Sequence, residues 1–326
     1  MQHSPPETTT RHHDVVVIGG GAAGIAVTAS LLRRRGDLDI AIIEPAEQHS
    51  YQPGWTLVGG GVFSADITRR PMRDVMPDKA TWYASLAEMI DPERATVTLA
   101  DGSCLGYQRL VVAPGLVVDW GAIDGLEATL GENGVTSNYR VDLAPYTWKL
   151  VQSLKQGKAL FTQPPMPIKC AGAPQKAPAF IAGSRLGNDA GWLDIDAETL
   201  QHVRHPAIFG LGDASGTSNA KTAAAVRKQA PVVAENLLSS LEDQPLKAAY
   251  LGYGSCPLAV EKGRVVLAEF GYGGVLQPTF PSWLNDGTQP TRRAWWLKAR
   301  QLPWLYWNGM LKGREWLAAP VCRDGA

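Results

Sequence analysis

The stretch DVVVIGGGAAGIAVTASLLRRRGDLDIAIIE, residues 14–44, decides the fold of this chain. It opens with DVVVI, a run of strand length, and glycines follow at once with the spacing G-x-G-x-x-G. A helix-like segment comes next and ends in three arginines, and a second apolar strand ends at Glu44. A glycine motif alone is weak support. Strand, motif, helix, strand and terminal acid together predict a dinucleotide-binding unit.

Each residue of this motif has a physical task. Gly19 allows a tight turn, Gly21 lets the backbone approach a pyrophosphate, and Gly24 permits close packing of helix on strand. The helix N-terminus supplies N–H donors and partial positive charge to the phosphates. Glu44 can accept a hydrogen bond from a ribose hydroxyl, and its charge disfavours a 2′-phosphate. The candidate contacts are therefore Gly19, Gly21, Ala22, Ala23, Gly24 and Glu44.

Composition narrows the class of protein. A chain of 326 residues, 45% hydrophobic and 19% charged, can bury a core and has room for about two domains. Its 31 basic and 31 acidic residues balance, so we expect no nucleic-acid partner. Four cysteines are too few for a secreted disulfide scaffold of this length. The N-terminus has neither signal nor transit character, and no apolar run approaches the ~18 residues of a spanning helix.

A second nucleotide contact is expected late in the chain. HPAIFGLGDASG (205–216) is a strand that runs into Gly-Asp, and residues 219–237 are expected to be a helix with Lys221 in its first turn. With VVAPG (111–115), this resembles the flavin motifs of the FAD-dependent pyridine-nucleotide-disulfide reductase superfamily. The resemblance implies FAD, with a positive helix end beside the flavin. It adds the candidate contacts Gly115, Asp213, Lys221 and Thr222.

The four cysteines fall into two groups. Cys104, in a hairpin-like stretch, and Cys322, near the end, are expected to be inert. Cys170 is expected at a strand-to-turn edge after a strand over 157–169, and Cys256 lies at a similar edge in YGSCPLAV. Each alone is more often structural. Two together, in a flavoprotein without another redox group, favour a thiol–flavin relay.

Longer stretches resemble the sulfide:quinone oxidoreductase family, in the subgroup that includes the mitochondrial enzyme. The resemblance implies that Cys170 and Cys256 are a redox pair on one face of the flavin, and that Gln52 and Ala87 also lie at the FAD. The stretches that carry it, in order, are YQPGWTLVGGG (51–61), KCAGAPQK (169–176), GWLDIDAETLQHVRHPAIFGLGDA (191–214), KTAAAV (221–226), YGSCPLAVEKGRVVLAEF (253–270) and LPWLYWNGMLKG (302–313).

The activity implied is sulfide oxidation. Hydrogen sulfide, as hydrosulfide, attacks the Cys170–Cys256 disulfide or a sulfur-bridged form of it, and leaves a persulfide on one cysteine. The released thiolate passes two electrons to FAD, a quinone reoxidises the flavin, and a small nucleophilic sulfur acceptor removes the sulfane sulfur.

The C-terminal part predicts contact with a membrane surface. Residues 281–316 hold six of the eleven tryptophans, and residues 287–314 contain six basic and no acidic side chains. TRRAWWLKARQL and WLYWNGMLKG are expected to be two amphipathic segments broken at Pro303. The alternative is an aromatic lid on the protein's own core. The expected location is the surface of the bacterial cytoplasmic membrane, or of the inner mitochondrial membrane in a eukaryote.

The predicted fold class is α/β: a Rossmann-type FAD-binding domain, a truncated second dinucleotide-type domain and a C-terminal membrane-associating segment. The first half of the FAD domain spans 12–115, and the return segment spans 191–240. Residues 116–190 form a shortened middle domain that carries Cys170, because the family resemblance stops at Lys176 and resumes near 191. Residues 241–326 form the C-terminal domain with Cys256.

Three other interpretations remain open. A type II NADH:quinone oxidoreductase shares the FAD domain but needs a second glycine motif, which the sequence lacks. A flavocytochrome-type sulfide dehydrogenase needs an export signal and a haem partner. A catalytically impaired FAD-binding remnant fits the shortened middle domain.

Overall fold

The computed structural model describes residues 10–162 and 173–323. At its centre is a seven-stranded sheet in the order β5-β2-β1-β8-β7-β6, with β11 also paired to β8. Strands β5, β2, β1, β8 and β11 run parallel, and β7 and β6 continue antiparallel. These strands are β1 (Arg11–Ile18), β2 (Ile40–Ile43), β5 (Ala80–Tyr83), β6 (Ala87–Asp91), β7 (Thr96–Leu99), β8 (Cys104–Val112) and β11 (Ile208–Gly210).

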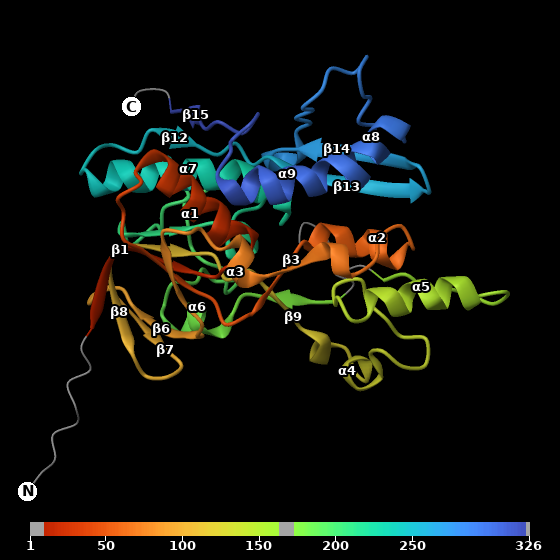
Figure 1. Ribbon diagram of the computed structural model, residues 1–326, viewed down its shortest axis with the longest axis horizontal. Coiled ribbons are helices and arrows are strands. Elements are labelled where there is room, and N and C mark those ends of the chain that lie inside the picture. Colours follow the sequence, from red (N-terminus) through yellow and green to blue (C-terminus); the bar gives the residue numbers. More distant parts are fainter. Residues whose placement is uncertain (1–9, 163–172, 324–326) are drawn as a thin grey trace, which may run out of the picture.

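The parallel strands form because both of their faces are covered. Residues 15–17 and 40–42 are fully buried, as in the continuous apolar strands of parallel sheets. Helices α1 (Ala22–Arg34) and α7 (Ala223–Leu241) pack against each other above the sheet in Figure 1, with α9 (Leu302–Asn308) beside them. The expected strand–helix–strand unit over residues 14–44 is therefore confirmed as part of a Rossmann-type fold.

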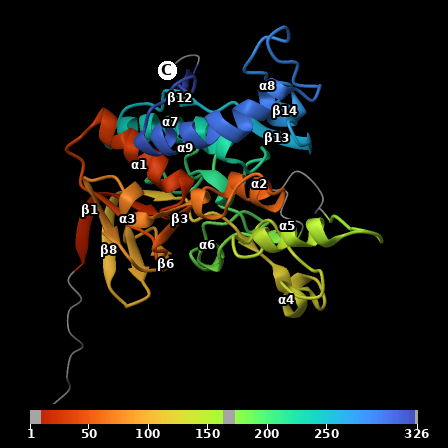
Figure 2. The same cartoon turned by 45° about the vertical axis from the view of Figure 1, so that its right-hand side comes forward.

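Between β8 and β11 the chain leaves the sheet and returns to the same place. Ile208 pairs with Leu110, two residues before β8 ends. Helices α4 and α5 lie outside the sheet in Figures 1 and 2, whereas Ile181 of α6 and Leu186 are fully buried in the main core. The elements of this excursion are β9 (Val117–Val118), α4 (Leu126–Thr129), α5 (Ala144–Ser153), β10 (Gln175–Lys176) and α6 (Ala179–Gly183).

The strand expected over 157–169 does not form in its described part. Residues 158–162 have no regular secondary structure, and residues 163–169 lie outside the described range. Leu160 and Phe161 are 88% and 86% exposed. A strand needs a neighbouring strand to satisfy its backbone groups, and no strand of the described residues is paired with this stretch in a sheet.

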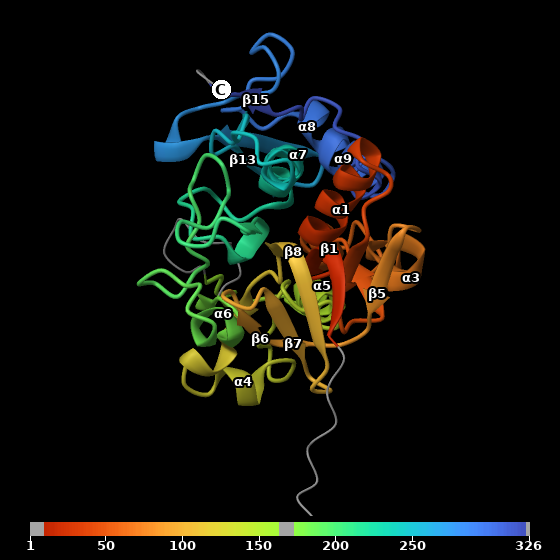
Figure 3. The same cartoon turned by 90° about the vertical axis from the view of Figure 1, so that its left-hand side faces the viewer.

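The C-terminal part packs above the central sheet, as Figure 3 shows from the side. The hairpin of β13 and β14 pairs Cys256 with Ala268. The elements of the C-terminal part are β12 (Ala248–Ala249), β13 (Gly254–Glu261), β14 (Arg264–Phe270), α8 (Arg292–Trp296), α9 and β15 (Val321–Cys322). Residues 48–75, between β2 and β5, form β3 (Gln48–Ser50), α2 (Trp55–Gly59), β4 (Arg69–Pro71) and α3 (Met72–Val75).

The helix break expected at Pro303 is wrong. The chain is helical from α8 through a π-helical turn, Leu297–Gln301, into α9, and Pro303 lies in the first turn of α9. Proline lacks an N–H and is tolerated in a first helical turn. The wider π turn shifts the hydrogen-bond ladder just before the proline, so the helix continues.

Candidate active site

The glycine-rich turn has the predicted geometry. Gly19 has φ +103°, and a Cβ there would lie 2.4 Å from the carbonyl oxygen of Ala113. A Cβ on Gly24 would lie 1.8 Å from the carbonyl oxygen of Gly19. At Gly21 a Cβ would meet no atom within 4 Å. The outer glycines therefore permit close packing, and the middle one borders open space at the start of α1, where Ala22 and Ala23 form the first turn.

Glu44 lies at the carboxyl end of β2, directly beside this turn. Its Oε2 accepts a hydrogen bond from the Gly20 N–H at 2.8 Å, and its Oε1 accepts one from the Ala46 N–H at 2.8 Å. Its own N–H donates to the Tyr83 carbonyl at the end of β5. Ala87 follows Tyr83 by four residues, so it lies within about 14 Å of this edge by chain length alone.

The return segment reaches the same edge. Gly212 has φ +77°, and a Cβ there would lie 3.0 Å from the Cβ of Ala23. The Gly212 N–H donates to Gln229 Oε1 on α7 at 2.9 Å. Asp213 is half-buried in the turn that follows. Gly115 also has positive φ, +77°, and borders open space.

Lys221 lies before α7, not in its first turn as the sequence suggested. Thr222 is the N-cap, and its Oγ1 accepts from the Ala225 N–H at 3.1 Å, so the helix begins at Ala223. The Lys221 side chain is 7% exposed. Its Nζ donates to the Ser215 carbonyl at 2.6 Å and lies 4.0 Å from the ring centroid of Trp192. The structure thus holds a buried cation just ahead of the helix N-terminus.

His49, which sequence reasoning missed, connects the glycine turn to α9. His49 Nδ1 lies 3.1 Å from the Gly20 carbonyl, and Nε2 lies 2.7 Å from the Tyr306 hydroxyl. The ring of Tyr306 lies 4.7 Å from that of Tyr51. Burial, with a smaller contribution from Arg70, lowers the pKa of His49 to about 4. The neutral ring therefore donates from Nδ1 to the carbonyl and accepts at Nε2.

Gln52 follows this network. It begins a one-turn helix, Gln52–Gly54, and its side chain is exposed next to the buried Tyr51.

Helical spacing is the sequence signal that could have found the residues of α9 that contact His49. Tyr306, Trp307, Met310 and Leu311 are all buried and follow an i, i+1, i+4, i+5 pattern, which marks one helix face.

Cys256 lies on a strand that packs near the start of α7. It is the third residue of β13 and half-buried. Two residues earlier, a Cβ on Gly254 would lie 3.3 Å from the Cβ of Ala220, the neighbour of Lys221. Cys170, its expected partner, lies outside the described residues.

Lys298, another residue that sequence reasoning missed, lies beside Cys256. Its Nζ donates to the carbonyl of Pro257 at 2.6 Å. Burial lowers the pKa of Lys298 to about 8, and the Cys256 thiolate acts in the opposite direction. The sequence suggested a membrane-facing basic residue at this position, and nothing local in WWLKARQL distinguishes it from its neighbours.

The other two cysteines lie elsewhere. Cys104 begins β8, where its Sγ lies 3.7 Å from Thr98 Oγ1 across the predicted hairpin. Cys322 is exposed in β15.

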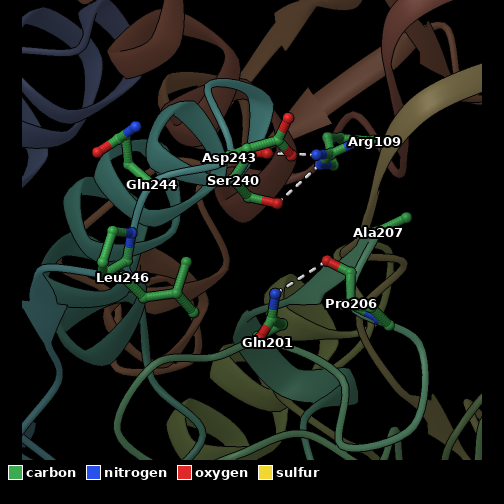
Figure 4. A pocket seen from close by; sticks show the side chains of 9 residues that line it. Arg109, Gln201, Pro206, Ala207, Ser240, Asp243, Gln244 and Leu246 are labelled. Atoms are coloured by element: carbon green, nitrogen blue, oxygen red, sulfur yellow. Dashed lines mark hydrogen bonds between the residues drawn. The ribbon is translucent and has the colours of Figure 1, made fainter.

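Figure 4 shows a hollow of about 410 Å³ that is unrelated to this edge. It lies between Ala207, just before β11, and Ser240, near the end of α7, so it is at the amino end of the strand. Arg109 Nε donates to Ser240 Oγ at 2.8 Å, and its Nη2 donates to the Ser240 carbonyl. The arginine ties α7 to β8 there.

In residues 10–162 and 173–323, no group of three or more histidine, cysteine or acidic side chains could hold a metal ion. Across the same ranges, no helix has the length and apolar character needed to cross a membrane.

Known proteins resemble this chain in sequence. The family model described as pyridine nucleotide-disulphide oxidoreductase matches residues 13–162. The mitochondrial sulfide:quinone oxidoreductase of Dictyostelium discoideum is 32% identical over 383 residues, which cover 89% of this chain and 84% of that protein. That alignment is longer than the chain itself, so the relative has internal residues without a counterpart here.

Two solved structures share the fold. A chain in the cryo-EM structure of the mitochondrial ATP synthase of Tetrahymena thermophila has a TM-score of 0.81 at 17% identity, covering 96% of this chain and 99% of that one. The sulfide:quinone oxidoreductase of Aquifex aeolicus has a TM-score of 0.73 at 16% identity, covering 94% and 92%. At such low sequence identities, these structural similarities support only the assignment of the fold.

Proposed function

We propose, from the premise that this chain belongs to the sulfide:quinone oxidoreductase family, that it oxidises sulfide through a cysteine pair and passes the electrons to a membrane quinone. As a member of that family it is an FAD-dependent oxidoreductase. One observation carries the proposal: the strand of Cys256 packs on the residue that precedes Lys221, at the N-terminus of the helix that faces the dinucleotide edge.

The residues at this edge fit FAD. The open space at Gly21 and the first turn of α1 suit a pyrophosphate, and Glu44 suits a ribose hydroxyl. Gly115 borders open space, and Asp213 follows Gly212, which packs on Ala23 in the first turn of α1. We assign Gln52 and Ala87 to the FAD site through the family resemblance. When bound, FAD supplies a two-electron acceptor.

The cysteine pair performs the sulfur chemistry. Hydrosulfide attacks the Cys170–Cys256 disulfide, so one S–S bond breaks and another forms, which leaves a persulfide on one cysteine and a thiolate on the other. A small nucleophilic acceptor then takes the outer sulfur and leaves the second thiolate. The two thiolates re-form the disulfide by losing two electrons, which bound FAD would accept and a quinone would finally take up.

Two lysines support these steps. Lys298 is positioned beside Cys256 and favours its thiolate, because an opposite charge nearby stabilises the ionised form. Lys221, with the N-terminus of α7, supplies positive charge where the reduced flavin is anionic.

A membrane seat for the quinone is proposed over residues 281–316. Trp283, Trp296 and Trp304 are 80%, 57% and 52% exposed, and Arg292, Arg293 and Arg300 are exposed around them. Exposed tryptophan with interleaved arginine is typical of an interfacial surface. Trp307, in contrast, is buried on the protein's own core.

The first test is a visible spectrum of the purified, flavin-loaded protein under anaerobic conditions. Sulfide should bleach the flavin band, and a soluble quinone should restore it. Cys256→Ser should abolish the bleaching, whereas the matched control Cys104→Ser, on the remote hairpin, should leave it unchanged. A yellow protein that ignores sulfide would refute the relay, and bleaching by NADH instead would favour the type II NADH:quinone oxidoreductase.

A further inference from the structure

A second hollow, of about 530 Å³, lies between the C-terminal end of α1 and the chain that follows α9. We call it the arginine hollow. Three arginines and one carboxylate line it, so its wall carries net positive charge. Its lining residues are Arg33, Arg34, Gly313, Arg314, Glu315 and Trp316.

One of the arginines has a structural task. Arg34 pairs through both terminal nitrogens with Glu315 and through Nε with Glu235 at 3.2 Å. This pairing neutralises Glu315. Arg33 and Arg314 are exposed, and within the described part of the chain neither side chain makes a hydrogen bond or an ion pair. These two side chains therefore supply the uncompensated charge of the hollow.

The wall of the hollow is tightly packed. Gly313 has φ +64°, and a Cβ there would lie 2.6 Å from the backbone of Ala29 on α1. Ser30 Oγ donates to Glu315 Oε1 at 2.6 Å. The loop that carries Arg314 thus packs directly on α1, which brings Arg33 and Arg314 to the lining of one hollow.

Exposed aromatic rings border the hollow. Trp316 stacks on Trp304 of α9, with ring centroids 5.8 Å apart and planes 4° from parallel. The Arg314 guanidinium lies 5.5 Å from the Trp316 ring. Trp316 and Leu317 are 46% and 73% exposed. The arginine hollow is therefore continuous with the tryptophan surface proposed to meet the membrane.

We propose that the arginine hollow binds the phosphate of an anionic phospholipid, with the Trp304–Trp316 stack beside it at headgroup depth. This rests on the proposed membrane seat. A guanidinium can give two parallel hydrogen bonds to a phosphate, and two unpaired guanidinium groups at one opening match a phosphate diester in charge and donors. Tryptophan prefers the same depth.

The test measures binding of the flavin-loaded full chain to vesicles of phosphatidylcholine, with and without phosphatidylglycerol. The wild type should prefer the mixed vesicles. Arg33→Gln and Arg314→Gln should each lower that preference about fivefold, the equivalent of about 1 kcal/mol for a basic residue at an anionic surface. Both variants should keep binding to phosphatidylcholine alone. Arg94→Gln, on the exposed turn between β6 and β7, is the charge-matched control and should change nothing.

A second variant separates a phosphate site from diffuse charge. Arg33→Lys keeps the charge but loses the planar fork, so it should lose part of the preference; full retention would overturn the proposal. A second experiment titrates the protein with inorganic phosphate. Phosphate binding that requires Arg33 and Arg314, in a protein that shows no preference for vesicles with phosphatidylglycerol, would assign the hollow to free phosphate instead. A wild type that binds neither vesicle would refute the membrane seat itself, whereas unchanged preference in both Gln variants would refute the hollow only.

Discussion

His49 is one buried side chain that joins the glycine turn to Tyr306 of α9, which lies 257 residues after His49 in the chain. The pKa of His49 is about 4 in the folded protein and about 6.5 when unfolded. Between these pH values the unfolded chain binds a proton that the folded chain does not. The stabilisation is therefore complete above pH ~6.5 and is lost as the pH falls towards ~4.

The expected loss over this window is about 3 kcal/mol of unfolding free energy. Urea denaturation between pH 7 and pH 4 should show it as the difference between wild type and His49→Gln. The pKa of His202 is also lowered by burial, but His202 is present in both proteins and its contribution cancels. Parallel pH profiles would show that His49 is not held neutral.

Lys298 offers a second prediction for a single residue. If its charge favours the Cys256 thiolate, Lys298→Met should raise the pH at which Cys256 reacts half-maximally with iodoacetamide, by about one pH unit. Lys298→Arg should keep the wild-type profile. Because the pKa of Lys298 is about 8, the difference should shrink above that pH. The exposed Cys322 serves as an internal standard, and identical profiles for Met and wild type would remove Lys298 from the site.

These two residues also show what sequence alone could not supply. The glycines of the turn and Glu44 could be predicted as nucleotide contacts because their role depends on residues within one short strand–helix–strand unit. His49 contacts Gly20, and Lys298 contacts Pro257, only because the fold brings distant segments together. The residues next to His49 and Lys298 in the sequence do not indicate these contacts. Cys170 stays a prediction, because it lies outside the described residues.

The glycine turn allows a prediction at the scale of an element. In Gly21→Ala the methyl group enters open space, so the fold should stay intact, but the FAD content should fall because that space suits the pyrophosphate. In Gly24→Ala the methyl group would meet the Gly19 carbonyl, so α1 must shift, at a cost of about 3 kcal/mol.

Flavin absorbance and urea denaturation separate the two effects. Gly183→Ala, in α6, also places its methyl group in open space and should change neither quantity by a comparable amount. A Gly21→Ala protein that retains its full complement of FAD would contradict the assignment of this space.

Whole elements were predictable where their pattern is local. The strand–helix–strand unit and the β7–β8 hairpin both follow from local patterns of apolar and turn residues. The strand over 157–162 failed because a strand requires a partner, and apolar composition does not provide one. The break at Pro303 failed because a π turn and the packing of Tyr306 and Trp307 let the helix continue.

The whole molecule gives the last prediction. FAD would touch segments near residues 21, 44, 115 and 213, which are far apart in the chain, so it should stabilise the fold as a unit. At a hundredfold excess over the Kd, binding adds about 2.7 kcal/mol. Thermal unfolding of stripped protein against increasing FAD should show a rising Tm, with AMP as a control that fills only part of the site. A Tm indifferent to FAD would contradict the proposed contacts.

The pairing of β11 beside β8 has one more consequence. The chain departs after Val112 and re-enters at Ile208, which pairs with Leu110 on the adjacent strand, so the two ends of the excursion are about 8 Å apart, whatever lies between them. Such a junction tolerates inserted segments of different lengths. Within the excursion, Val117 pairs with Lys176, so the ends of residues 116–176 also lie side by side. An unrelated domain with adjacent termini, inserted in place of residues 116–176, should therefore leave the strands of the central sheet undisturbed.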